Sequence, residues 1–315
     1  MIFHDGLYYY CESKDHRRIC LRKSSSIFSI GQDPGVCIWH APEFGPNSNA
    51  VWAPELHRID GKWFIYYAAD NGKNKYHRMW VLESESHDPM GPYQCRGQLE
   101  TGGWAIDGTI LSIENELYLI WSGWPTARNG QQNLYIARMR DPITIDGTRV
   151  LLSTPNHSWE RSGMPICEGP QVLQRNGRIF IVYSASGSWT IDYCLGLLAY
   201  QGGDLLDPKS WVKHGPVFEK TDEVWGVGHC SFVTSPCGNE DWILYHSKSS
   251  RAAGWHDRDV HAKQFAWRAD GMPDFGQPVP RRGLPTPVQV PEMTADFPML
   301  STTVPVPSTQ TFAHA

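Results

Sequence analysis

The sequence predicts an all-β protein, and specifically a five-bladed β-propeller, from three observations. Five segments share one plan: a short strand, a turn, and a second strand rich in aromatic and β-branched residues. Their turn residues are spaced by 55, 55, 61 and 61 residues. Gly and Pro make up 52 of the 315 residues, about 17% against an average of roughly 12%, which implies many turns. Repeats of this length with hairpin signals are typical of four-stranded propeller blades.

The five segments justify the blades in chain order. Residues 1–13, MIFHDGLYYYCES, match only the back half of the plan, a turn followed by an aromatic strand. The whole plan occurs in residues 51–69, 104–123, 166–187 and 228–247. The five turn residues are Gly6, Gly61, Glu116, Gly177 and Gly238. A β-sandwich with chance similarity between its strands is the alternative, because aromatic hairpins resemble one another.

A change in composition near residue 284 marks the predicted end of the propeller domain, which we place at residues 1–283. Residues 285–315 hold six Pro, six Thr and two Ser, no Lys or Arg, and no strand pattern. Such a composition is typical of a linker or a disordered tail. The sequence therefore predicts one globular domain followed by a Pro/Thr-rich segment at 284–315.

Composition and charge exclude several classes of function. With 41% hydrophobic and 19% charged residues the chain can bury a large core, so extensive disorder is excluded. A net charge of −5, without a block of like charge, argues against a nucleic-acid partner. No run of 18 apolar residues and no basic-apolar leader occurs, so neither a membrane span nor a signal peptide is expected in this chain.

The eight cysteines are scattered, without a C-x-x-C pair. A metal cluster is therefore not expected, and their number does not distinguish a disulfide-permitting compartment from a reducing one. They are Cys11, Cys20, Cys37, Cys95, Cys167, Cys194, Cys230 and Cys237.

The candidate site follows from one repeat position. The first strand of each propeller blade lines the central axis, so equivalent residues of successive blades converge. Counting nine residues back from the last four turns gives Trp52, Asp107, Glu168 and His229. One aromatic ring, two carboxylates and one imidazole suit chemistry better than packing. The same count from Gly6 passes the N-terminus, so one converging position is missing, and Asp5, Asp15 and Asp33 do not replace it by register.

Each of these residues has a functional and a structural interpretation. Two acids of one site can have their pKa values pushed apart, an arrangement that serves glycosidic bond cleavage; pairing with an Arg is the structural alternative. Trp52 offers a flat surface for a sugar ring, although a Trp beside a Pro is more often a core residue. His229 could be a core histidine, a residue near a water-bound ion, or a direct metal ligand.

The chain resembles glycoside hydrolase family 43, and most closely its α-L-arabinofuranosidase members. The motifs that carry the resemblance are VWAPELH, AIDGTI, NGQQNLYIARMRDP, CEGPQVLQRNGRIFIVYSASGSW, GVGHCSF, NEDWILYHS and WRADGMPDFGQPV, in the family's order over about residues 1–280. The resemblance implies a five-bladed propeller, an inverting mechanism and three axial carboxylates: an Asp base, an Asp that tunes the acid, and a Glu acid.

Carried over residue by residue, the resemblance implies the following roles. Glu168 in CEGP is the general acid, and Asp107 in AIDGT modulates its pKa. His229 in GVGHCSF matches a histidine near an axial calcium or water, and Arg258 in DRDVHAK matches an Arg near the glycone. Trp52 and Trp124 are the further substrate-binding candidates. No cofactor is required, although a structural calcium near the axis is expected.

The family's base lies in an Asp-Pro pair that begins the first inner strand, and this sequence starts after the corresponding position. We therefore expect blade one to lack its inner strand, and the activity to be impaired, since loss of base assistance typically costs 10² to 10⁴-fold in rate. The full-length protein is expected to be extracellular, because arabinan and arabinoxylan lie outside cells.

The sequence thus predicts an inverting hydrolase, acting as a monomer, that releases terminal L-arabinofuranose from plant cell-wall polysaccharides or oligosaccharides. β-Xylosidase and endo-arabinanase activities remain open, because loops set the depth of the pocket. The alternative from another class is a non-catalytic carbohydrate-binding propeller. A kelch- or WD-type scaffold is disfavoured by axial carboxylates, and a retaining, invertase-like enzyme would differ in the anomeric configuration of its product.

Overall fold

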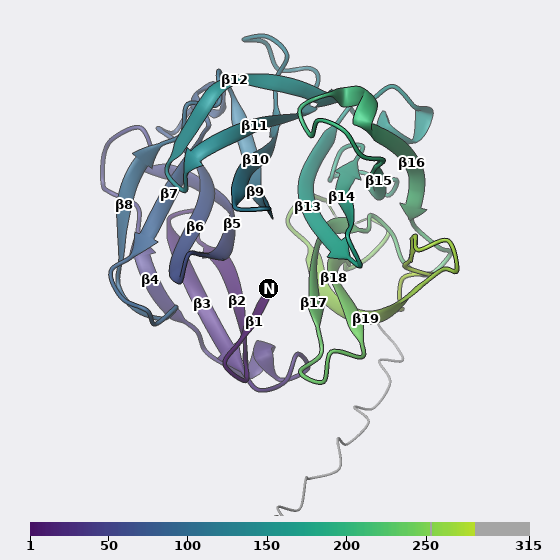
Figure 1. The fold of residues 1–315 in the computed structure, drawn as a ribbon, viewed down its shortest axis with the longest axis horizontal. Coiled ribbons are helices and arrows are strands. Elements are labelled where there is room, and N and C mark those ends of the chain that lie inside the picture. The colour runs from purple at the N-terminus through teal and green to yellow at the C-terminus, as the bar shows by residue number, and fades with distance from the viewer. Residues whose placement is uncertain (253, 281–315) are drawn as a thin grey trace, which may run out of the picture. The chain divides into compact units, whose positions relative to one another are not determined.

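The computed structural model describes residues 1–252 and 254–280, and these form five four-stranded antiparallel sheets. Each sheet consists of four strands that are consecutive in the chain. The sheets follow one another around a central axis in chain order (Figure 1). The predicted all-β, five-bladed propeller is therefore confirmed. The proposed boundary at residue 284 and the Pro/Thr-rich segment lie outside the described residues.

The strands have the following bounds. Blade one contains β1 (Ile2–His4), β2 (Leu7–Lys14), β3 (Arg18–Ser24) and β4 (Val36–His40). Blade two contains β5 (Asn49–Ile59), β6 (Lys62–Asp70), β7 (Arg78–Ser84) and β8 (Tyr93–Gln98). Blade three contains β9 (Ala105–Ile113), β10 (Glu116–Gly123), β11 (Asn133–Asp141) and β12 (Thr144–Ser153). Blade four contains β13 (Cys167–Arg175), β14 (Arg178–Ala185), β15 (Cys194–Tyr200) and β16 (Trp211–Phe218). Blade five contains β17 (Gly228–Thr234), β18 (Asp241–Lys248), β19 (Arg258–Trp267) and β20 (Pro273–Asp274).

Short 3-10 helices lie in the connections. They are η1 (Ile30–Gln32), η2 (Asn74–Tyr76), η3 (Ser158–Glu160) and η4 (Pro208–Ser210). Among the described residues, no helix is long and apolar enough to cross a membrane.

The expectation that blade one lacks its inner strand is wrong. Its inner strand is not missing: β1 pairs with β2 through Ile2↔Tyr9, Phe3↔Tyr8 and His4↔Leu7, around a turn at Asp5–Gly6. Three residues are enough to form this pairing because the turn residues both adopt positive φ, which closes a tight hairpin. Blade one therefore has the four strands of the other blades, with a shorter strand at the axis.

The core is divided into clusters that lie between neighbouring blades. Strand residues of blades two and three form one cluster, and blades three and four, four and five, and one and two form three others of similar kind. Blades two, three and four each pack against a neighbouring blade on both faces, which explains the apolar, aromatic strands of the repeats. Blades one and five share a smaller cluster, consisting of Tyr8, Ile27, Ile30, Val233 and Leu244.

The structure also settles the cysteine pairing that the sequence left open. Cys20 and Cys37 form a disulfide between β3 and β4, across a sequence separation of 17 residues. The other six cysteines are free thiols.

Candidate active site

A β-bulge at one position of four inner strands builds the site. In β5, β9, β13 and β17, two successive residues oppose a single residue of the neighbouring strand. The first bulged residue of each strand has positive φ, at 44°, 57°, 52° and 49° for Ala53, Asp107, Gly169 and His229. The opposing residues are the buried aromatics Tyr67, Trp121, Tyr183 and Tyr245. A bulge re-aims side chains, and here it aims them at the axis.

The bulges correct the register of the predicted repeat position. Asp107 and His229 occupy the bulged position itself, whereas Trp52 and Glu168 precede it by one residue. The turn of blade three lies at residues 114–115, because Glu116 already begins β10, and the loop of blade five is longer. Both positions still line one cavity because the bulge breaks the strict alternation of side chains.

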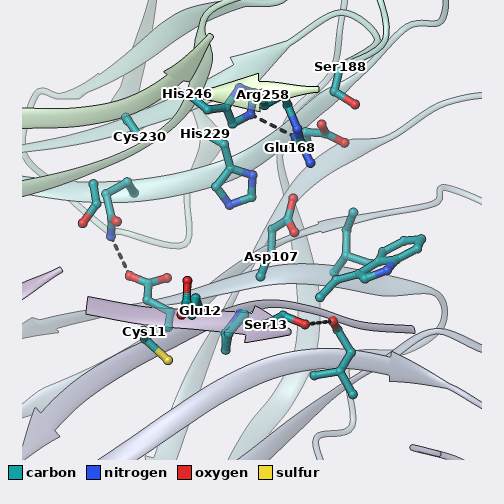
Figure 2. Close-up of a pocket in the computed structure, with 18 of the residues that line it drawn as sticks. Cys11, Glu12, Ser13, Asp107, Glu168, Ser188, His229, Cys230, His246 and Arg258 are labelled. Carbon is teal, nitrogen blue, oxygen red and sulfur yellow. Dashed lines mark hydrogen bonds between the residues drawn. The ribbon is translucent and has the colours of Figure 1, made fainter. Parts of the chain in front are cut away.

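The inner strands enclose a cavity of about 800 Å³, a volume typical of small-molecule sites. It brings together the predicted residues Trp52, Asp107, Glu168, His229 and Arg258. Figure 2 shows Asp107, Glu168 and His229 with their side chains directed into this cavity. The convergence expected from the repeats is therefore what the structure has, apart from the shift of register.

Glu168 is buried, with 9% of its surface exposed, and its Oε1 accepts a hydrogen bond of 2.9 Å from the hydroxyl of Tyr193. Burial, and after it the negative charge of Asp107, raise the pKa of Glu168 to about 8, although Tyr193 and the cation of Arg258 oppose the shift. Glu168 therefore carries a proton at neutral pH. Burial also raises the pKa of Tyr193 well above its usual value, so its hydroxyl remains a donor.

Asp107 is buried beside Glu168 and is held by the backbone of the next blade. Its Oδ2 accepts a hydrogen bond of 3.0 Å from the N–H of Gly169, the residue that follows Glu168. Burial raises the pKa of Asp107, while His229 and the Gly169 N–H act in the opposite direction. A Cβ at residue 169 would lie 3.2 Å from the His229 ring, so glycine permits this close approach. The position of Asp107 is thereby tied to that of Glu168.

His229 supplies one imidazole to the cavity, and its backbone N–H donates to Ser184 Oγ at 2.7 Å. Calcium takes six to eight oxygen ligands. In the described part of the chain, no group of three or more His, Cys, Asp or Glu side chains is placed to hold a metal ion. These residues do not fit a calcium ion held by protein side chains.

Trp52 forms part of an aromatic wall whose other members the sequence did not reveal. Its ring stacks on His77, with centroids 4.1 Å apart, and meets Trp255 edge-on at 5.8 Å. His77 is itself oriented by Asp70, whose Oδ2 lies 3.1 Å from His77 Nδ1. Trp104 also lines the cavity. Aromatic faces of this kind match the apolar faces of sugar rings.

The structure does not support the predicted substrate-binding role of Trp124, because this side chain lies behind the wall of the cavity. Trp124 is only 4% exposed and stacks behind Trp104, with centroids 4.5 Å apart and an angle of 9° between the rings. It packs in the apolar cluster between blades two and three, where burial of its large ring is most favourable. Trp104 lines the cavity but is itself only 5% exposed, so neither ring offers a broad surface to a sugar.

Arg258 begins β19 and lines the cavity, as expected. Its Nη1 lies 3.1 Å from His246 Nε2, and the His246 ring stacks on Tyr193 with centroids 5.5 Å apart. Burial, together with the cation of Arg258, lowers the pKa of His246 well below its usual value, so the imidazole is neutral. A sequence signal for His246 exists: it directly follows the aromatic residue that opposes the bulge in blade five.

A five-bladed propeller whose axial cavity holds a protonated glutamate beside an aspartate has the architecture of a propeller glycoside hydrolase. Comparison with known proteins agrees with this class. The chain belongs to glycosyl hydrolases family 43, whose family model matches residues 1–273.

Individual relatives are similar over most of the chain. Alpha-L-arabinofuranosidase 43 of Humicola insolens is 38% identical over 91% of this chain and 62% of its own length. An extracellular exo-alpha-(1->5)-L-arabinofuranosidase of Streptomyces avermitilis is 35% identical over 87% of this chain and 60% of its own length. The crystal structure of an alpha-L-arabinofuranosidase from Lactobacillus brevis superposes with a TM-score of 0.83 at 35% identity, covering 88% of this chain and 92% of that one. The chain thus spans about three-fifths of the length of the first two relatives.

Proposed function

We propose that this chain is a glycoside hydrolase that releases terminal L-arabinofuranose from arabinan- or arabinoxylan-type polysaccharides or their oligosaccharides, with inversion. The observation that carries the proposal is Glu168, a carboxylic acid with a pKa of about 8 beside Asp107 in the axial cavity. The similarity to arabinofuranosidases of Humicola insolens and Streptomyces avermitilis supports the choice of sugar.

In this proposal Glu168 protonates the glycosidic oxygen as the bond to the leaving group breaks. Tyr193 occupies Oε1, which leaves Oε2 to carry the proton that is transferred. Asp107 keeps Glu168 protonated through its charge and aligns it through the Gly169 N–H. Trp52 on β5 supports one face of the terminal sugar, and Arg258 at the start of β19 binds the hydroxyl groups of that sugar.

An inverting reaction also requires a base that activates water. Three further carboxylates line the cavity, and each already has partners. Glu12 lies 2.9 Å from Arg22, and Asp15 lies 2.9 Å from Arg18. Glu55 accepts hydrogen bonds within the cavity floor. We therefore assign no base among the described residues, and propose that hydrolysis by this chain is slow, since loss of base assistance typically costs 10² to 10⁴-fold in rate.

We place the protein outside the cell. The Streptomyces relatives are named extracellular, and the Cys20–Cys37 disulfide is of a kind that persists in oxidising compartments. A carbohydrate partner follows from the proposed reaction.

The proposal is tested with 4-nitrophenyl α-L-arabinofuranoside, 4-nitrophenyl β-D-xylopyranoside and linear α-1,5-arabinan, with the product anomer recorded by ¹H NMR. We expect slow release of L-arabinose, as the β-anomer, from the first and third substrates. No arabino-oligosaccharides should accumulate, because an exo-acting enzyme removes only terminal residues. Glu168→Gln is the matched control: it should spare the activated aryl glycoside, whose leaving group needs little protonation, and abolish arabinan cleavage.

Two results would contradict the proposal. Preferential xyloside hydrolysis would make the chain a β-xylosidase. Saturable binding of arabinose oligosaccharides without product over long incubation would instead support a non-catalytic carbohydrate-binding propeller.

A further inference from the structure

A half-exposed tryptophan at the mouth of the cavity has no role in the mechanism above. Trp189 lines the cavity, yet 46% of its surface is exposed. It lies in the connection between β14 and β15, directly after the buried Ser188. A large aromatic ring in this setting either exposes apolar surface without benefit or has a partner.

The connection that carries Trp189 is held in place by hydrogen bonds to the segment that follows η3. The N–H of Ser162 donates to Ser186 Oγ at 2.9 Å, and the N–H of Gly187 donates to the Ser162 carbonyl at 2.8 Å. Ser162 Oγ also donates to Asp192 Oδ2 at 2.6 Å. The tryptophan is therefore presented by a rigid element, which reduces the entropy lost on binding.

Two glycines form the floor beneath the ring. A Cβ at Gly187 would lie 2.6, 2.7 and 3.0 Å from three ring carbons of Trp189, and one at Gly163 would lie 3.0 Å from its Nε1. Similar distances to several ring atoms mean that Gly187 lies under the face of the indole. The ring thus rests on backbone with one face and leaves surface on the other side exposed.

The position of the loop relative to Glu168 identifies the ligand. The loop leaves β14 just after Ser184, which pairs with Glu168, and it ends at Tyr193, which donates to Glu168 Oε1. Figure 2 shows Ser188 on the side of the cavity where Glu168 and Arg258 lie. A general acid protonates the oxygen of the leaving group, so the leaving sugar lies on the side of that acid.

We propose that Trp189 is the stacking platform for the sugar residue on the leaving-group side, so that the site recognises an arabinofuranosyl oligosaccharide of at least two residues. This inference rests on the proposed function, because it takes the position of the leaving group from the role of Glu168. The terminal arabinofuranose occupies the cavity beside Asp107 and Trp52. The next sugar of the chain lies against the exposed surface of Trp189.

The test measures binding by isothermal titration calorimetry in the Glu168→Gln background, which prevents consumption of the ligand. The ligands are methyl α-L-arabinofuranoside, α-1,5-arabinobiose, α-1,5-arabinotriose and xylobiose. We expect the parent protein to bind arabinobiose about tenfold more tightly than the methyl glycoside, a factor that corresponds to about 1.4 kcal/mol. Trp189→Ala should lose that gain and keep its affinity for the methyl glycoside, whereas Trp189→Phe should retain part of the gain.

Phe44→Ala is the matched control, because Phe44 is an exposed aromatic residue that lines a different depression of the surface. It should bind all four ligands as the parent does. An undiminished preference for arabinobiose in Trp189→Ala would overturn the platform. A parent protein that binds none of the arabinosyl ligands would refute the proposed function, and with it the ligand assigned to Trp189. Tighter binding of xylobiose that still depends on Trp189 would support the platform and refute the arabinosyl ligand.

Discussion

Two glutamates line the same cavity with opposite shifts of pKa. Burial favours the neutral acid at both Glu168 and Glu55. At Glu168 the charge of Asp107 adds to burial. At Glu55 the imidazole of His57 and hydrogen bonds from Gln171 and Thr109 outweigh burial, so its pKa is lowered. The immediate neighbours of each carboxylate therefore decide which one can act as an acid.

The raised pKa of Glu168 predicts a specific dependence of stability on pH. Between the ordinary carboxyl pKa of 4.5 and about 8, the unfolded chain releases this proton while the folded protein retains it. The contribution of Glu168 to stability is therefore complete below pH 4.5 and is lost as the pH rises towards 8. Gln does not titrate, so Glu168→Gln should gain melting temperature relative to the wild type as the pH rises from 5 to 8.

This comparison is made by differential scanning fluorimetry across the pH range, with Glu219→Gln as a control on the protein surface. A constant difference in melting temperature between wild type and Glu168→Gln would show that Glu168 has an ordinary pKa.

Asp107→Asn tests the influence of Asp107 on the acid. Removing the negative charge should lower the pKa of Glu168, because Asp107 is the second largest cause of its elevation after burial. Since catalysis requires protonated Glu168, the alkaline limb of the pH–rate profile should move to lower pH. The profile is measured on α-1,5-arabinobiose, whose poor leaving group must be protonated by Glu168. An alkaline limb that stays at the wild-type position would make Asp107 a structural residue only.

Among the elements, the inner strands of blades two, three and four are joined below the catalytic residues. Glu55 Oε1 on β5 accepts hydrogen bonds from Thr109 Oγ1 on β9 at 2.8 Å and from Gln171 Nε2 on β13 at 2.6 Å. Thr109 follows Asp107 by two residues on β9, and Gln171 follows Glu168 by three residues on β13. The carboxylate thus fixes the spacing of the two strands that carry the catalytic pair.

We predict that Glu55→Ala lowers the free energy of unfolding by about 2 kcal/mol, because Thr109 and Gln171 lose their shared acceptor in a poorly hydrated position. The matched control is Glu12→Ala. The two glutamates have similarly exposed side chains, at 22% and 20%, but Glu12 pairs only within blade one. Its loss should cost less than about 1 kcal/mol. Urea denaturation measures both variants, and equal losses would refute the bridging role of Glu55.

At the scale of the whole molecule, the five blades are not joined equally. In the described part of the chain, the first and last blades share a small apolar cluster around Tyr8 and Leu244. They are also joined by two ring contacts, His16–Trp255 and Phe28–Trp242, and by the amino group of Met1, which donates to Ser231 Oγ at 2.7 Å. Every other pair of neighbouring blades is joined by a larger apolar cluster among the described residues. Local opening is easiest where few apolar contacts are buried. The ring should therefore open between blades one and five.

Hydrogen exchange followed by mass spectrometry tests this seam. We expect the amides of β17 to exchange faster than those of β9, its counterpart in blade three. Val233→Ala, which shrinks the cluster of the seam, should accelerate exchange in β17 and in β1 while leaving β9 unchanged. Equal protection of β9 and β17 in the wild type would contradict a weak seam.

Local sequence determined the repeats and therefore most of the site. Each blade is encoded by a hairpin with its own turn and its own apolar pattern, so the fold and the convergence of Asp107, Glu168 and His229 could be predicted from spacing alone. The same spacing misplaced two residues by one position, because counting from a turn does not reveal where the turn begins. The bulges were also not predicted, although an aromatic residue opposes the bulge in each of the four repeats that have one.

Tertiary structure decided what spacing does not encode, namely which side chains meet between blades and how much water they exclude. Tyr193 reaches the acid from the connection before β15, which no repeat marks, and the His246 ring on β18 stacks on Tyr193. Trp104 and Trp124 are equally aromatic in sequence, yet one lines the cavity and the other lies behind it. The pKa of Glu168 has the same origin: the carboxyl group is ordinary in the chain, and the packing of neighbouring blades around it removes the water that would stabilise its charge.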